Sequence, residues 1–236
     1  MSLHTAESLS NAVAAICPDI QSRVQHSVGD CDERTLWWEL SSCILSSQVP
    51  YPLATAAADE IDRKELLFRR YSDQDHLQKK LIDLLTRPLI VEGKPRKYRF
   101  PVVRARNLAR CHAIVTTTEH SLTELVHSFD SSIEARKWFV KYVPGLGPKQ
   151  ASMFLRNVGV SYDLAILDRH VLNYMLQLGI YSGTKLFISS LKQYYKHETV
   201  LQRHAHELRC PVGLLDWAIW IVMRVANQRD MELAAI

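Results

Sequence analysis

Two short amphipathic runs separated by a tight turn form the clearest periodic pattern in this chain. The first run covers residues 136–143, and the sequence Pro-Gly-Leu-Gly-Pro follows at 144–148. In the second run, apolar residues recur at i, i+3, i+4 and i+7, which places them on one face of a helix that Gly159 ends. These residues are Ala151, Phe154, Leu155 and Val158. The pattern predicts a helix-hairpin-helix unit at about 136–159.

Helical periodicity extends over most of the remaining chain. The expected helices cover residues 33–47, 54–68, 75–85, 122–129, 171–178, 185–196 and 199–208, after a mixed helical region before residue 30. Pro211 begins a last long helix, whose predicted buried face consists of Leu215, Ile219, Val222, Met223 and Ala226. No alternating strand pattern of useful length is present. We therefore expect an all-α fold over residues 1–236, a single domain in two helical lobes with a cleft that holds the helix-hairpin-helix unit.

The two glycines of the hairpin allow its backbone to approach a ligand closely. Gly145 and Gly147 precede a helix whose first amides have no partner within it. Such a helix start attracts an anion, and the phosphate of a nucleic acid is the obvious candidate. A connector that binds nothing is the alternative for so short a motif.

Lys149 lies in the first turn of the same helix, on a face with Met153 and Arg156 that is opposite the apolar face. The positive helix end opposes the charged form of a lysine, and a lysine that loses its proton readily is a nucleophile able to form a Schiff base. Asp168 follows the apolar run at 164–167 and precedes another helical run, so we expect it to be an N-cap whose negative charge the helix dipole favours. A helix cap with no further role is the alternative for Asp168.

A basic segment at residues 94–110 contains seven Lys and Arg side chains and no acidic one, interleaved with Tyr98 and Phe100. This composition suits a surface that contacts phosphates, and a merely solvated face is the alternative. The candidates for phosphate contact are Lys94, Arg96, Lys97, Arg99 and Arg104.

Composition changes this picture only modestly. A net charge of +4 suits a nucleic-acid partner without requiring one, and 47% hydrophobic with 23% charged residues is ordinary for a globular protein. The five cysteines are scattered and include no Cys-x-x-Cys pair, which argues against a disulfide framework or a zinc site and for a reducing compartment. Neither a signal pattern nor an apolar run of 18 residues is present, so we expect a cytoplasmic protein without membrane association.

Four sequence words carry a family resemblance: PGLGPKQAS, FLRNVG, DLAI and LDRH, in this order from residue 144 to residue 170. Together they resemble the catalytic signature of the helix-hairpin-helix, Gly/Pro…Asp superfamily of DNA glycosylases, and they are most similar to type-2 8-oxoguanine DNA glycosylases. The word ELSSCILSSQ, which ends at Gln48, resembles the early helix and following turn of that family. The resemblance extends over roughly residues 33–230 and includes the basic segment.

The resemblance implies a bifunctional DNA glycosylase and AP lyase that binds double-stranded DNA with a modified base in its cleft. Lys149 would attack C1′ of the damaged nucleotide, and Asp168 would be the essential carboxylate. Gln48 would fill the gap left by the flipped base, the alternative being an ordinary helix C-terminus. Such an enzyme needs neither a cofactor nor a bound metal, and we expect a monomer.

Two departures from the family pattern concern the base pocket. The family usually has histidine where this chain has Met153, and it ends in a lysine that helps to read 8-oxoguanine, whereas this chain ends MELAAI. Further pocket candidates on the last helix are Asp216, Trp217 and Trp220, for which core packing is the alternative.

Because of these departures, 8-oxoguanine is the first expectation for the substrate and a bulky modified cytosine is the second. An example is the glucosylated hydroxymethylcytosine of some phage genomes, whose excision would serve antiviral defence. A hypothesis of another class is a non-catalytic helix-hairpin-helix module, which needs the hairpin and the basic segment but neither Lys149 nor Asp168. It predicts DNA binding without strand cleavage.

Overall fold

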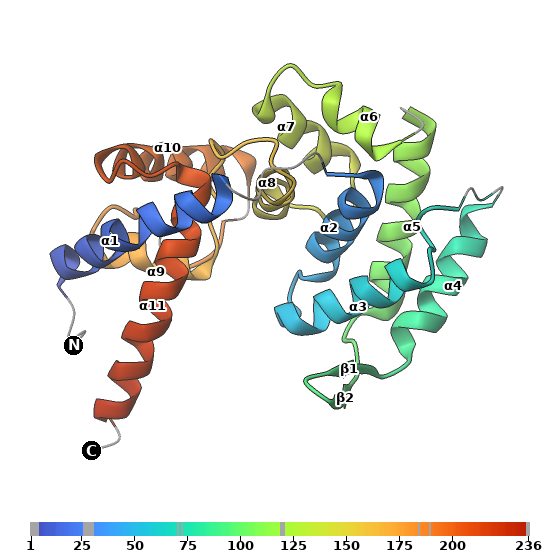
Figure 1. Cartoon of the computed structure of the whole chain (residues 1–236), viewed down its shortest axis with the longest axis horizontal. Helices are drawn as coiled ribbons and strands as arrows, with labels where there is room; N and C mark the ends of the chain where they lie inside the picture. The colour runs from blue at the N-terminus through green and yellow to red at the C-terminus, as the bar shows by residue number, and fades with distance from the viewer. Residues whose placement is uncertain are drawn as a thin grey trace. The chain divides into compact units, whose positions relative to one another are not determined.

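The computed structural model describes residues 5–25, 31–69, 71, 73–118, 121–183, 185–188 and 190–234, and it describes no side chains for 25 and 227–234. Contacts divide the chain into two units. Unit 1 combines Met1–Gly29 with Ser161–Ile236, and unit 2 is the continuous segment Asp30–Val160. Both units consist mainly of helices (Figure 1), so the all-α prediction is confirmed. In the described ranges, no helix combines the length and the apolar character that spanning a membrane requires.

Unit 2 is organised around its first helix. Its elements are α2 (Glu33–Leu45), α3 (Tyr51–Arg63), α4 (Gln74–Thr86), β1 (Leu89–Val91), β2 (Lys94–Arg96), α5 (Pro101–Thr118), α6 (Leu122–His127), α7 (Ser132–Tyr142) and α8 (Pro148–Asn157). Helix α2 contacts α3, α5, α6 and α8 (Figure 1). Its apolar face is buried, and it consists of Leu36, Leu40, Cys43 and Ile44. The helix begins where Asp32 caps it, because Asp32 Oδ1 accepts a hydrogen bond from the Thr35 amide at 2.8 Å.

Glu33 joins the start of α2 to the start of α6. Its Oε1 accepts hydrogen bonds from the Leu122 amide at 2.8 Å and from Trp37 Nε1 at 2.7 Å. Its Oε2 accepts from the Thr123 amide at 2.8 Å and from the Thr123 hydroxyl at 2.6 Å. One carboxylate thus satisfies two of the amides that the first turn of α6 leaves without helical partners.

The expectation of no strands was wrong for one short segment. Strands β1 and β2 form an antiparallel hairpin in which Leu89 lies opposite Arg96. Glu92 and Gly93 connect them with φ values of 50° and 74°, as a tight two-residue turn requires. Each strand has only three residues, which is too short for an alternating pattern to be recognised.

Two helix boundaries also differ from the prediction. Helix α3 begins at Tyr51 directly after Pro50 and ends at Arg63, so it lies several residues earlier than the predicted helix at 54–68. Helix α10 runs without interruption over Leu191–Glu207, where two helices were expected. The residues between those two expected helices, His197 and Glu198, are not helix breakers.

Unit 1 packs its helices around the last one. The elements are α1 (Ala6–Gln25), α9 (Arg169–Gln177), α10 (Leu191–Glu207) and α11 (Val212–Ala234), and α11 contacts the other three (Figure 1). The predicted face of α11, from Leu215 to Ala226, is buried. At the start of α11 the Gly213 amide donates to the Tyr162 carbonyl at 2.8 Å. A Cβ at position 213 would lie 2.8 Å from the same oxygen, so this approach requires glycine.

We predict that Glu33→Ala lowers the free energy of unfolding by about 2–4 kcal/mol, because it leaves the α6 amides and the Trp37 indole without their acceptor. Urea unfolding followed by tryptophan fluorescence measures the effect. The control is Glu60→Ala, which removes a surface ion pair with Arg63 one turn away and should cost less than about 0.5 kcal/mol. Equal losses in the two variants would contradict the assigned role of Glu33.

Candidate active site

The helix-hairpin-helix unit consists of α7, the turn at 143–147 and α8. Val143 and Leu146 are buried and anchor the turn. Gly145 has a φ of +84°, and Gly147 is the N-cap of α8, where it provides no side-chain cap. Pro148 occupies the first helical position. The start of α8 therefore presents backbone amides rather than a capping side chain, as the anion-binding interpretation requires.

Two side chains of α5 lie against the hairpin at Gly145. A Cβ at this position would overlap Asn107 Nδ2 and would lie 3.3 Å from Arg104 Nη1. Glycine is thus required here both for its positive φ and for the close approach of α5. No motif singled out Asn107, although it follows Arg104 by three residues and so shares its helical face.

Arg104 is buried, unlike the other predicted phosphate contacts. Its Nη2 donates to the Ser47 carbonyl at 2.8 Å, so the guanidinium lies between the hairpin and the turn that contains Gln48. Gln48 itself is exposed and has a φ of 61°, an uncommon conformation for a residue other than glycine. The predicted contacts of Arg104 and Gln48 with DNA stay predictions.

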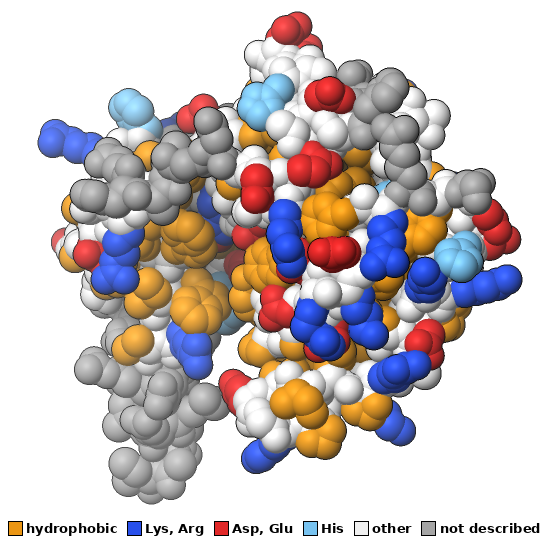
Figure 2. Space-filling model, turned by 45° about the vertical axis from the view of Figure 1, so that its right-hand side comes forward, with side chains coloured by type: hydrophobic (Ala, Val, Ile, Leu, Met, Phe, Trp, Pro, Cys, Tyr) orange, Lys and Arg blue, Asp and Glu red, His pale blue; other side chains and the backbone are white. Residues whose placement is uncertain are grey.

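The remaining candidates in the basic segment are exposed: Lys94, Arg96, Lys97 and Arg99. Lys94 and Arg96 lie on β2, and the guanidinium of Arg99 lies 4.9 Å from the centroid of the Phe100 ring. The space-filling view shows Lys and Arg side chains of unit 2 among Asp and Glu side chains (Figure 2). These four residues can contact phosphates without any rearrangement of the core.

Lys149 and Met153 of α8 are half-buried, whereas Arg156 is buried. Arg156 is 3% exposed and Ser152 is 0% exposed. The face that Lys149, Met153 and Arg156 share is therefore covered at Arg156, because α8 packs on both α7 and α2. Arg136 of α7 is also fully buried, and its Nη1 donates to Ser152 Oγ at 3.1 Å.

Glu39 and Cys43 of α2 face α8. Asn157 Nδ2 donates to Glu39 Oε2 at 2.9 Å, while burial raises the pKa of the Glu39 carboxyl above its usual value. Burial also raises the pKa of the Cys43 thiol, and the negative charge of Glu39 acts in the same direction. The positive charges of Arg156 and Lys149 act in the opposite direction on Cys43. These neighbours of α8 come from a distant part of the chain, so no local pattern could reveal them.

Asp168 is the N-cap of α9. Its Oδ1 accepts from the Val171 amide at 2.8 Å, and its own amide donates to the Ile166 carbonyl at 3.0 Å. Among the described residues no hydrogen bond reaches Oδ2, so this oxygen can interact with a ligand. The predicted cap is confirmed. Lys149 belongs to unit 2 and Asp168 to unit 1, and their convergence on one sugar carbon stays a prediction.

The pocket candidates on α11 divide into buried and exposed residues. Asp216 is buried, whereas Trp217 is 37% exposed and Trp220 is 41% exposed. The guanidinium of Arg224 lies 5.0 Å from the centroid of a Trp220 ring. Asp216 is thus covered and the two tryptophans are accessible, and a base-pocket role for all three stays a prediction.

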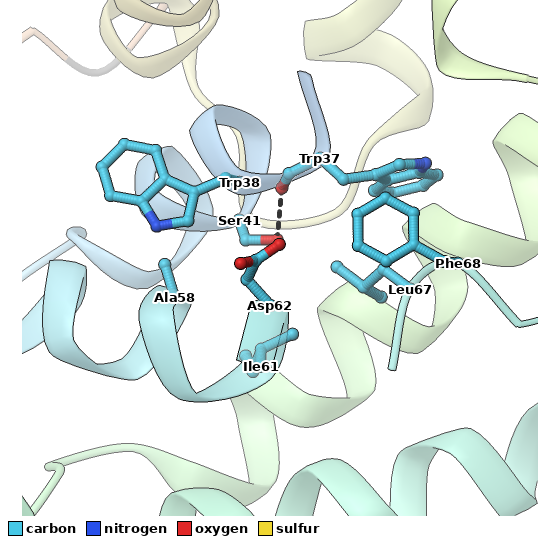
Figure 3. A pocket seen from close by; sticks show the side chains of 8 residues that line it. All are labelled: Trp37, Trp38, Ser41, Ala58, Ile61, Asp62, Leu67 and Phe68. Carbon is cyan, nitrogen blue, oxygen red and sulfur yellow. Dashed lines mark hydrogen bonds between the residues drawn. The ribbon is translucent and has the colours of Figure 1, made fainter. Parts of the chain in front are cut away.

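A small cavity between α2 and α3 is not a base pocket. Trp38 lies on one side of it and Trp37 with Phe68 on the other, with Ser41 and Asp62 between them (Figure 3). Its volume is about 10 Å³, which is barely enough for one water molecule.

Comparison with known proteins gives one matching family. The family model described as 8-oxoguanine DNA glycosylase matches residues 22–210. The 8-oxoguanine DNA glycosylase/AP lyase of Sulfurisphaera tokodaii is 32% identical over 189 residues, which cover 80% of this chain and 82% of the relative. The protein of the same name from Thermoplasma volcanium is 33% identical over 185 residues, with 78% of each chain covered.

Solved structures of similar proteins share the fold. The 8-oxoguanine DNA glycosylase of Thermotoga maritima superposes with a TM-score of 0.68 at 26% identity, over 91% of this chain and 95% of the other. The Methanocaldococcus jannaschii 8-oxoguanine glycosylase/lyase, solved with DNA containing 8-oxoguanine, gives a TM-score of 0.69 at 24% identity and covers 90% of this chain and 95% of its own. The second likeness concerns the fold alone.

We predict that Gly145→Ala weakens DNA binding about tenfold, because the new methyl group displaces Asn107 and shifts the hairpin. Fluorescence anisotropy with a labelled duplex measures the dissociation constant. The control is Gly159→Ala, whose φ is +75° but whose Cβ would meet nothing within 4 Å.

Both substitutions should cost about 1–2 kcal/mol of stability for the left-handed conformation. Only Gly145→Ala should affect DNA affinity. Unchanged affinity in Gly145→Ala would contradict the role of the hairpin in binding DNA.

Proposed function

This chain belongs to the 8-oxoguanine DNA glycosylase family, and on that premise we propose that it is a bifunctional DNA glycosylase and AP lyase. It extrudes 8-oxoguanine from double-stranded DNA, releases the base and then cuts the strand. The observation that carries the proposal is the placement of Lys149 in the first turn of α8, inside a hairpin unit that the family model covers. We expect it to act as a monomer in the cytoplasm, on chromosomal or invading DNA.

In the proposed mechanism, DNA is held by its backbone while one nucleotide leaves the stack. The amides at the start of α8 and the exposed side chains of Lys94, Arg96, Lys97 and Arg99 bind phosphates. Gln48, exposed on its turn, occupies the gap in the stack. A base inside the duplex hides its glycosidic bond, so this extrusion must precede the chemistry.

The chemistry begins when the amine of Lys149 forms a bond to C1′ and the glycosidic bond breaks. The base leaves with the electron pair of that bond and takes up a proton. The free oxygen of Asp168 stabilises the positive charge that develops on the sugar or accepts the proton lost by the lysine. Ring opening gives a Schiff base, and loss of a C2′ proton then expels the 3′ phosphate.

The substrate assignment depends on a different set of side chains. Met153 has no hydrogen-bond donor to offer the base, whereas Trp217 and Trp220 have exposed rings that a base can stack on. A pocket that works by stacking and shape could also admit a bulky modified cytosine, which keeps that substrate as the second candidate. Membership of the family disfavours the non-catalytic module.

We predict that borohydride traps wild-type protein on DNA with an abasic site, because it reduces the Schiff base to a stable amine. Lys149→Gln should give no adduct. The control is Lys141→Gln, which removes an exposed lysine from the last turn of α7 and should be trapped like the wild type. An adduct with Lys149→Gln would show that another amine is the nucleophile.

Asp168→Asn should lower base release by about a hundredfold or more in single-turnover assays. Asparagine is an equally good N-cap, so it keeps the bond from the Val171 amide and removes only the charge. Full activity in a normally folded Asp168→Asn variant would reduce Asp168 to a helix cap.

The substrate can be identified by measuring base release from a panel of DNA duplexes that carry different bases. We expect release of 8-oxoguanine and no release of unmodified guanine or of glucosylated hydroxymethylcytosine. Each duplex carries a single modified base, and high-performance liquid chromatography of the free base measures the product. Exclusive release of the glucosylated cytosine would replace 8-oxoguanine as the substrate, and binding without any cleavage would favour the non-catalytic module.

A further inference from the structure

The segment that leads into Asp168 is buried and irregular, and in the described part of the chain no strand pairs with it. Its apolar residues are Leu164, Ala165, Ile166 and Leu167. Buried backbone amides and carbonyls must find hydrogen-bond partners, and in this segment side chains supply them.

Helix α10 provides these partners from one face. Tyr194 Oη donates to the Ala165 carbonyl at 2.8 Å and accepts from the Leu167 amide at 3.1 Å. Glu198 Oε1 accepts from the Ala165 amide at 2.9 Å. Gln202 Nε2 donates to the Asp163 carbonyl at 3.3 Å.

The three side chains follow one another at intervals of four residues, so they lie along a single stripe of α10. Tyr194 and Glu198 are 2% and 3% exposed, which excludes water from these bonds. The stripe therefore supplies backbone hydrogen bonds that a paired strand would supply in a sheet.

The same helix is also joined to α9, which begins after Asp168 (Figure 1). The hydroxyl of Tyr174 on α9 lies 2.9 Å from His204 Nε2 on α10. Helix α10 thus holds the chain on both sides of Asp168. Asp168 itself is tied to the segment at residues 164–167, because its amide donates to the Ile166 carbonyl at 3.0 Å.

We propose that Tyr194 and Glu198 are positioning residues, which fix the segment at residues 164–167 and so determine where the Asp168 carboxylate lies. The inference rests on the proposed role of Asp168 in catalysis. Neither residue touches the reacting atoms; each acts through the backbone of residues 165–167.

Tyr194→Phe tests the proposal, because it removes both hydroxyl bonds and keeps the ring. We expect the Leu167 and Val171 amides to exchange with solvent about tenfold faster, since the first loses its acceptor and the cap at the second loosens. Base release in a single turnover should fall about tenfold, whereas the dissociation constant for DNA should stay within about twofold.

The matched control is Tyr181→Phe. Tyr181 is also a buried tyrosine of unit 1, and its hydroxyl donates to the Lys185 carbonyl at 2.6 Å, which does not lead to Asp168. This variant should keep wild-type exchange at Leu167 and Val171 and a wild-type rate of base release.

A second pair of variants separates positioning from packing. Glu198→Gln keeps an oxygen that accepts from the Ala165 amide, so its rate of base release should stay within about threefold of the wild type. Glu198→Leu has no acceptor and should lose about tenfold or more in that rate.

Unchanged exchange at Val171 in both Tyr194→Phe and Glu198→Leu would overturn the proposal, as would equal losses in DNA affinity and base release. A wild-type protein that releases no base from any duplex would instead refute the proposed function. The exchange measurement would still decide whether α10 holds the Asp168 cap, because it needs no substrate.

Discussion

The position of α8 depends on polar side chains that are buried or half-buried against the neighbouring helices. Arg136 donates to Ser152 at 3.1 Å, and Asn157 donates to Glu39 at 2.9 Å. A buried polar group is costly without a partner, so these bonds favour one arrangement of α2, α7 and α8 over others. Lys149 lies one turn before Ser152. The arrangement in which the buried arginine bonds to Ser152 therefore also fixes the first turn of α8.

The two proposed reactive residues both lie at the start of a helix, although they belong to different units. Lys149 is in the first turn of α8, and Asp168 is the N-cap of α9. A helix start combines a rigid backbone with groups that the helix itself does not bind, so a side chain there is both fixed and accessible. In unit 2, the contacts of Arg136 and Glu39 support the start of α8. In unit 1, the stripe on α10 supports the start of α9.

Periodicity predicted those parts of the fold that depend on local burial. The apolar faces of α8 and α11 are buried as their spacing indicated, and Asp168 caps α9. Polar residues in the core could not be predicted in this way. A sequence pattern assigns a charged side chain to the exposed face of its helix unless the distant residue that it bonds is known. Arg104 reaches the Ser47 carbonyl and Glu198 reaches the Ala165 amide, both far away in sequence. The three-residue strands were missed because they are shorter than the alternating pattern that identifies a strand.

Chemistry and base selection depend on different features of this chain. The groups proposed for the chemistry are placed by helix starts, turns and buried hydrogen bonds, which a substitution on an open face leaves intact. The candidates for base selection are side chains such as Met153 and Trp220, which are half-buried or exposed and have few polar partners. A change of methionine or tryptophan there alters shape and stacking without disturbing the backbone beneath. A chain of this design can therefore keep one reaction while the base it accepts changes.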